Sequence, residues 1–137
     1  MVENFGGSIL YLVLFIVQLL ALSFYGFLIL FKPKTLTEDY SFGDKAVPLV
    51  RLVGSFIIPF ILIGIYLMFT SIEGAWVFFI FGLLFAVYQL ACDILTRMGV
   101  VDSSHNVVNK TQDTILSIVF IIVNLIIING LQDKLFL

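Results

Sequence analysis

The chain has 137 residues, of which 61% are hydrophobic and 12% are charged, and its mean hydropathy is +1.18. A soluble domain carries about 45–50% apolar and about 25% charged residues, so this composition excludes a soluble globular protein and a disordered one. Seven basic and nine acidic residues give a formal charge of −2, which provides no basic field for nucleic acid. The composition predicts a small integral membrane protein that partners the lipid bilayer and no nucleic acid.

Four stretches of the chain are apolar enough to cross a bilayer, which requires roughly 20 mainly apolar residues. They predict one membrane domain over residues 1–137, an all-α integral membrane protein folded as an up-and-down bundle of four transmembrane helices. Long apolar runs without alternating polar residues argue against membrane β-strands. Pro33 ends the first stretch because a proline cannot continue the helix ladder. The predicted spans are residues 8–31, 46–69, 75–97 and 113–131.

The distribution of basic residues predicts the orientation in the membrane. An even number of spans places both termini on one side and the two longer loops on the other. Lys134 is the single basic residue on the terminal side, and the other six lie on or near the loops. The positive-inside rule then predicts cytoplasmic loops and two external termini. The loop-side basic residues are Lys32, Lys34, Lys45, Arg51, Arg97 and Lys110.

Two charged residues inside the predicted spans suggest a contact between helices. A charge within a span costs a few kcal/mol on insertion scales, so such residues usually face the bundle and find partners. Arg51 and Asp93 are equally distant along the chain from Ile72, near the centre of the short connection between the second and third spans. At about 1.5 Å per residue, an antiparallel hairpin would place them at the same depth. The spacing predicts an ion pair near the cytoplasmic edge of the bilayer.

The third span carries further polar residues at helical spacing. Gln89, Asp93 and Arg97 recur every four residues and would form one stripe. If the next loop turns near His105, Arg97 is level with Asp113. The same counting places Ser117 level with Asp93, and Ser55 level with Gln89. Gln18 and Asn124 are expected to make hydrogen bonds between helices. The predicted intramembrane network is Arg51, Gln89, Asp93, Arg97 and Asp113, with Ser55, Ser117, Gln18 and Asn124 as secondary candidates.

Two interpretations of this network are open. It can fix the register of the helices, a modest role because polar contacts between membrane helices contribute about 0.6 kcal/mol on average. Alternatively, Asp93 is a proton or cation site with an arginine as counter-charge. An aspartate with two arginines within reach stays ionised, which favours the structural role.

No motif of an enzyme or of a cofactor site stands out in the sequence. His105 is the single histidine and lies in a loop, and Cys92 is the single cysteine. One histidine and one cysteine cannot supply a structural zinc or iron–sulfur site within one chain. We therefore predict no catalytic residue, no metal and no cofactor.

Three functions remain as hypotheses. The preferred one is a non-catalytic subunit or accessory, structural component that packs against other membrane protein subunits or against copies of itself. The first alternative is a homo-oligomeric small transporter or channel that uses Asp93 as a proton or cation site. The second alternative is a membrane-embedded enzyme, or a binding protein for an apolar or lipid ligand.

Overall fold

The structure, a computed structural model, describes residues 1–102, 104 and 108–137, and in this part of the chain every regular element is a helix. All four long helices are long and apolar enough to cross a membrane. The prediction of an all-α integral membrane protein built as a four-helix bundle is thus confirmed. The long helices are α1 (Ile9–Phe31), α3 (Val47–Phe69), α4 (Trp76–Arg97) and α5 (Thr111–Gly130).

Short helical elements join the long helices or extend them. Between α1 and α3 the chain forms α2 and then η2, and the two ends of the chain carry η1 and α6. The short elements are η1 (Val2–Phe5), α2 (Pro33–Asp39), η2 (Asp44–Ala46) and α6 (Gln132–Leu135).

The ends of the long helices lie within two residues of the predicted boundaries, the largest difference being the start of α5 at Thr111 instead of residue 113. Local signals explain this agreement. Pro33 stands at the first position of α2, where its missing N–H is tolerated. Gly99 follows α4 with a φ of 69°, a left-handed conformation that ends helices and that glycine adopts without steric cost.

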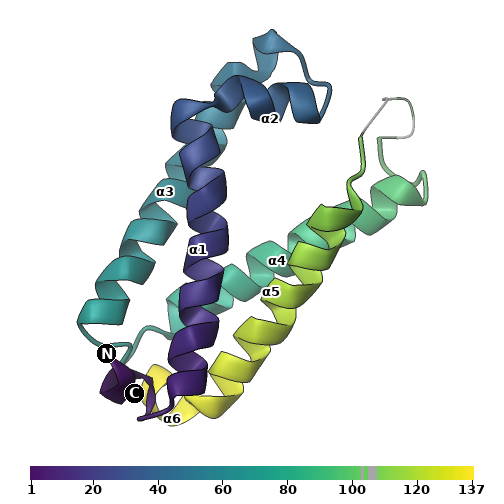
Figure 1. Ribbon diagram of the computed structural model, residues 1–137. Helices are drawn as coiled ribbons and strands as arrows, with labels where there is room; N and C mark the ends of the chain where they lie inside the picture. Colours follow the sequence, from purple (N-terminus) through teal and green to yellow (C-terminus); the bar gives the residue numbers. More distant parts are fainter. Residues whose placement is uncertain (103, 105–107) are drawn as a thin grey trace.

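The four long helices form two pairs that diverge (Figure 1). α1 packs against α3, α4 packs against α5, and α1 also contacts α5. The pairs meet at the end of the molecule where the two termini lie, and they separate toward the end that carries α2. The common end of the two termini agrees with an even number of spans, whereas the side of the membrane that they face stays a prediction.

Glycines allow α1 and α3 to approach closely. A Cβ atom at Gly54 would lie 2.6 Å from Cγ2 of Ile29, and one at Gly64 would lie 2.5 Å from Cδ2 of Leu19. Small residues at helix contacts are typical of membrane bundles, because packing rather than the hydrophobic effect drives helix association in lipid.

The core lies at the terminal end of the molecule. The Phe15 ring is 2% exposed and packs 5.1 Å from Phe5 and 5.6 Å from Phe79, measured between ring centroids. The chain ends are fastened over this core, since Nζ of Lys134 donates to the carbonyl of Glu3 at 2.8 Å. This end of the bundle is therefore closed by aromatic packing and by both termini.

The predicted ion pair between Arg51 and Asp93 is wrong. Both residues lie in the described part of the chain, and each makes its polar contacts elsewhere. The reason is that α3 and α4 do not pack along their lengths: Phe60, in the middle of α3, stacks at 4.2 Å on Phe78 in the first turn of α4, and the two helices make few other contacts. Equal distance from a turn gives equal depth only when two helices run side by side. The other predicted turn, near His105, lies outside the described residues.

Candidate ligand cavity

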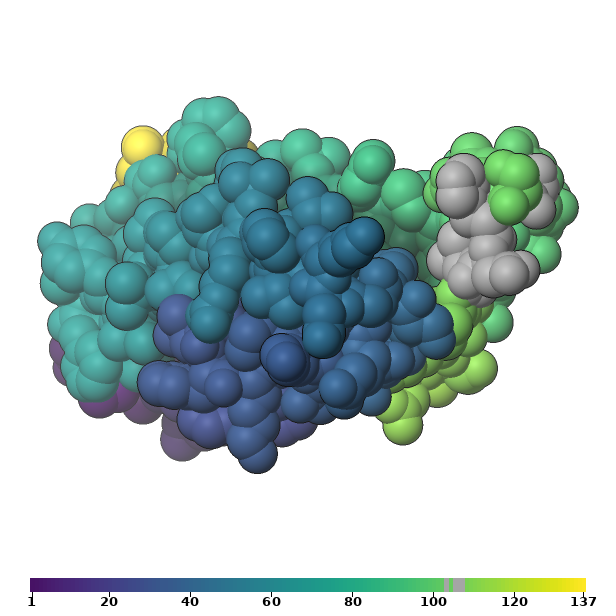
Figure 2. All heavy atoms as spheres, turned by 90° about the horizontal axis from the view of Figure 1, so that it is seen from above, coloured from purple at the N-terminus to yellow at the C-terminus, as the bar shows by residue number. Residues whose placement is uncertain are grey.

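A cavity of about 700 Å³ lies between the two helix pairs, and its floor is aromatic. Phe15, Phe60 and Phe78 line the end that faces the core, where Phe78 packs against both other rings. Leu36 of α2 and Phe42, just after it, line the opposite end. The view from that end shows the blue atoms of α2 and the residues after it over the centre of the face (Figure 2). The cavity is thus bounded at both ends.

The two long walls of the cavity differ in exposure. On α1 and α5, Gln18 and Asn124 line it and are 7% and 4% exposed. On α3 and α4, Phe56 and Phe81 line it and are 63% and 49% exposed. Because α3 and α4 diverge from their turn, the exposed wall marks a lateral opening between them, and the buried wall is its closed back.

The back wall carries a strip of polar side chains. Nε2 of Gln18 donates across from α1 to the carbonyl of Phe120 at 3.4 Å, and Nδ2 of Asn124 donates to the same carbonyl at 2.8 Å. Ser117 is buried one turn above Phe120 and also lines the cavity. The hydrogen bond of Gln18 joins two helices as the sequence predicts, whereas that of Asn124 stays within α5.

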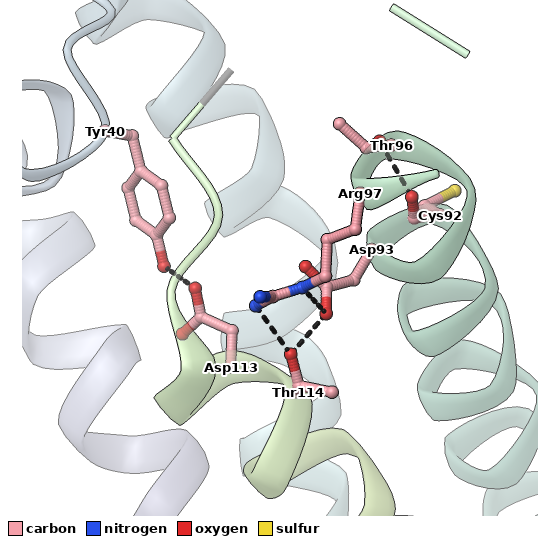
Figure 3. A network of polar contacts seen from close by, with 7 residues as sticks. All are labelled: Tyr40, Cys92, Asp93, Thr96, Arg97, Asp113 and Thr114. Atoms are coloured by element: carbon pink, nitrogen blue, oxygen red, sulfur yellow. Dashed lines mark hydrogen bonds and ion pairs between the residues drawn. The ribbon is translucent and has the colours of Figure 1, made fainter. Parts of the chain in front are cut away.

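Asp113 is the centre of a polar cluster at the α2 end of the cavity. The phenol of Tyr40 donates to Oδ2 of Asp113 at 2.5 Å, and the phenol of Tyr25 donates to Oδ1 at 3.4 Å. All three residues line the cavity. Figure 3 shows the Tyr40 ring pointing at this carboxylate. One carboxylate thereby connects α1, the end of α2 and the first turn of α5.

Burial is the main cause that raises the pKa of the Tyr40 phenol above its ordinary value of about 10. The hydrogen bond to Asp113 raises the pKa further, because it requires the phenol proton, and nearby negative charge acts in the same direction. Tyr40 is therefore a stable donor throughout the physiological range of pH.

Lys110 strengthens the attachment of α2 from its outer side. Its Nζ lies 3.3 Å from Oδ2 of Asp39 and 4.5 Å from the centroid of the Tyr40 ring. An ammonium over an aromatic face is attracted by the ring quadrupole. We call these three residues and Asp113 the α2 attachment. It holds the short helix to the beginning of α5.

Asp93 and Arg97 form a separate cluster that does not line the cavity. Nε of Arg97 lies 3.1 Å from Oδ2 of Asp93, and its Nη2 donates to the hydroxyl of Thr114 at 3.0 Å. That hydroxyl donates to Asp93, so the contacts close a triangle between α4 and α5 (Figure 3). The Asp93 side chain is 9% exposed. This geometry suits a connection between two helices.

The remaining predicted residues are dispersed. Nη1 of Arg51 donates to the carbonyls of Ile29 and Leu30 at 2.8 and 2.7 Å, so it satisfies the last turn of α1. Ser55 donates within its own helix. Gln89 lines the cavity and is exposed there. The predicted network of five residues is therefore divided among three places in the molecule.

Sequence reasoning missed the polar partners contributed by Tyr40, Lys110 and Thr114. Tyr40 and Lys110 lie outside the predicted spans, and the comparison of residue depths applies only within the spans. The sequence predicts that Arg97 is level with Asp113. Arg97 contacts Thr114, the next residue in the chain, so the predicted depth differs from the observed contact by one residue. Among the described residues, no three side chains of His, Cys, Asp or Glu are grouped so that they could hold a metal ion.

Comparison with protein-family models, with curated proteins and with solved structures finds no match to this chain.

Proposed function

We propose that this membrane protein binds a single lipid-like molecule, with one apolar chain and one polar head, in the cavity between its two helix pairs. The observation that carries the proposal is the sided cavity, with a buried and partly polar wall on α1 and α5 and an exposed apolar wall on α3 and α4. Ligand sites are usually lined by apolar and aromatic side chains, with a few polar groups that fix orientation.

The volume of the cavity favours a small ligand over an inserted helix of another protein. Its 700 Å³ falls within the range of about 300–1,000 Å³ that ligand pockets occupy. Ten residues of helix, about 15 Å long and about 10 Å wide, would require about 1,200 Å³. The role as an accessory subunit that the sequence suggests stays a prediction, and such a role would use the outer surface of the bundle.

The placement of the walls supports binding more than conduction. The lateral opening between α3 and α4 gives a chain-like molecule a route into the cavity from the acyl region of the bilayer. The aromatic floor at Phe15, Phe60 and Phe78 separates the cavity from the terminal end. The transporter hypothesis has less support because Asp93, its proposed ion site, lies outside the cavity lining.

A pair of adjacent tryptophan substitutions on α3 tests the proposal. Val53 lines the cavity and Leu52 does not, although both are aliphatic residues of α3 that are about half exposed. The delipidated protein in a neutral detergent is titrated with hexadecan-1-ol, and one-to-one adducts are counted by native mass spectrometry. We expect Val53→Trp to weaken the first adduct about tenfold, equivalent to about 1.4 kcal/mol, because the indole fills the cavity.

Leu52→Trp is the matched control and should bind hexadecan-1-ol as the unmodified protein does. Equal affinity of both variants and the unmodified protein would show that the cavity is not where the chain binds, and the proposal would be abandoned. Circular dichroism of each variant confirms that the helices are intact before binding is compared.

A further inference from the structure

We infer that the ligand carries a protonated amine as its head and places it beside Asp113, under α2. The inference rests on the proposed function and adds the chemical class of the molecule bound. It follows from the charge of the cavity lining, from the ion pairs of the surrounding residues, and from the aromatic surroundings of Asp113.

Asp113 is the single charged residue among the described residues that line the cavity, and its charge is negative. An anionic head, such as a fatty acid carboxylate, would meet this charge with no basic side chain on the lining to compensate it. Repulsion between like charges is strongest where water is excluded, because the effective dielectric constant falls there. The lining therefore disfavours fatty acids and other anionic ligands, which require a basic side chain in the cavity.

Asp113 also has no basic partner in the part of the chain that the structure describes. The three ion pairs there join Lys34 to Asp44, Arg97 to Asp93, and Lys110 to Asp39. Asp113 is half-buried and is held only by two neutral phenols. A carboxylate removed from water without a counter-charge is costly, and a cation beside it recovers a large part of that cost.

The phenols leave acceptor capacity for such a cation. Tyr25 and Tyr40 each donate one O–H to Asp113, which occupies one position on each carboxylate oxygen. Each carboxylate oxygen can accept a second hydrogen bond, and so can each phenol oxygen. An ammonium has three donors and no acceptor. It therefore matches the group of Asp113, Tyr25 and Tyr40, whose remaining hydrogen-bonding positions are acceptors.

An ammonium of the protein already lies beside this group, outside the cavity lining. Nζ of Lys110 lies 4.5 Å from the centroid of the Tyr40 ring, with Asp39 as its carboxylate. Within the cavity lining, Tyr25 and Asp113 present a similar combination of a phenol and a carboxylate, and no basic side chain belongs to that lining. A protonated amine in the cavity would contact Tyr25 and Asp113 as the ammonium of Lys110 contacts Tyr40 and Asp39.

The test compares three molecules that share a chain of sixteen carbons and differ in the head: hexadecylamine, hexadecan-1-ol and hexadecanoic acid. Each is titrated into the delipidated protein near neutral pH, and the first adduct is quantified by native mass spectrometry. We expect hexadecylamine to bind about tenfold more tightly than either of the others, because only the amine forms a partly buried charge pair with Asp113. Asp113→Asn should reduce that preference to less than about twofold.

Three variants make the result specific. Asp133→Asn removes the same charge from an exposed position at the opposite end of the molecule and should leave the preference unchanged. Asp113→Glu keeps the charge and should retain the preference. Undiminished binding of hexadecan-1-ol to Asp113→Asn shows that this variant is folded.

The outcomes separate this inference from the proposed function. Equal binding of all three heads, or an amine preference that survives in Asp113→Asn, overturns the inference. If Val53→Trp still weakens the binding of hexadecan-1-ol in that case, the cavity remains the binding site and only the head chemistry is wrong. If Val53→Trp weakens the binding of none of the three molecules, the proposed function fails and the inference fails with it.

Discussion

Tyr40 donates a 2.5 Å hydrogen bond to Asp113 although 73 positions separate them in the chain. This contact ties a residue outside the spanning helices to the first turn of α5, and it does so at the rim of the cavity. Asp113 therefore links the end of α2 to α5 and, through Tyr25, to α1.

Removing the phenol of Tyr40 should loosen α2. In Tyr40→Phe the ring packing is kept and the hydrogen bond to Asp113 is lost, which costs about 1 kcal/mol. We expect backbone amides of residues 34–39 to exchange with deuterium about fivefold faster, while those of α4 do not change. Tyr66→Phe is the control, because Tyr66 is 65% exposed and points outward from α3. Unchanged exchange in Tyr40→Phe would mean that packing alone holds α2.

The raised pKa of Tyr40 predicts a loss of stability in alkali. The folded protein holds the phenol proton more tightly than the unfolded chain, whose tyrosine has a pKa of about 10. Above that pH the unfolded chain loses the proton first, so the stabilisation is complete below about pH 10 and declines as the pH rises through the raised pKa of the folded state.

The measurement is the melting temperature between about pH 9 and about pH 11, the interval in which this linkage begins to act. The unmodified protein should lose stability more steeply than Tyr40→Phe, which lacks the ionisable group. Lysines titrate in both proteins and cancel in the comparison. Parallel pH profiles would contradict the expectation.

Arg51 and Asp93 should be energetically independent. Arg51 caps the end of α1 and Asp93 belongs to the triangle with Arg97 and Thr114, so the two share no contact. In a double-mutant cycle of Arg51→Met and Asp93→Asn, the coupling in the free energy of unfolding should stay within about 0.5 kcal/mol. The cycle of Asp93→Asn and Arg97→Met should give about 0.5–1 kcal/mol. A larger coupling in the first cycle than in the second would restore the ion pair that the sequence suggests.

Gly130 should resist substitution because Tyr11 occupies the space of a side chain. A Cβ atom at Gly130 would overlap the phenol ring of Tyr11, where α1 crosses the end of α5. Alanine adds about 1 kcal/mol of helix propensity, and the overlap costs about 1–3 kcal/mol, so Gly130→Ala should lower the melting temperature.

Two further variants identify the cause of that loss. Adding Tyr11→Leu to Gly130→Ala should restore part of the melting temperature by removing the ring. Asn129→Ala, at the exposed neighbouring position, should have little effect or a small stabilising one. A Gly130→Ala protein as stable as the unmodified one would place the two helices further apart than described.

The orientation can be measured with a thiol reagent that does not cross membranes. In a Cys92→Ser background, Thr35→Cys in α2 and Asp133→Cys in α6 place single thiols at opposite ends of the molecule, and both positions are exposed. The excess of basic residues near the loops predicts that intact cells react at position 133 and not at position 35. The opposite labelling would reverse the predicted orientation.

Features encoded over a few residues could be predicted from the sequence. The helix ends follow from signals such as Pro33 and Gly99, and the contact of Asp93 with Arg97 follows from their spacing on one helix. The contact of Arg51 with Asp93 was a wrong prediction, because depth counting fixes the height of a residue and leaves open which helices pack together.

The cavity could not be predicted for the same reason. It exists because α3 and α4 diverge beyond Phe60 and Phe78, and no local pattern encodes the angle between two helices. Tyr40 and Asp113 lie far apart in sequence, and neither is marked by a motif that announces its partner.

The bond between Lys134 and the carbonyl of Glu3 spans 131 positions. During synthesis α1 can enter the bilayer early, but the segment before it gains this contact only after residue 134 has been added to the chain. This contact between distant parts of the chain therefore forms late, and a bulky group placed beside Lys134 would disturb it while the earlier helices can still insert.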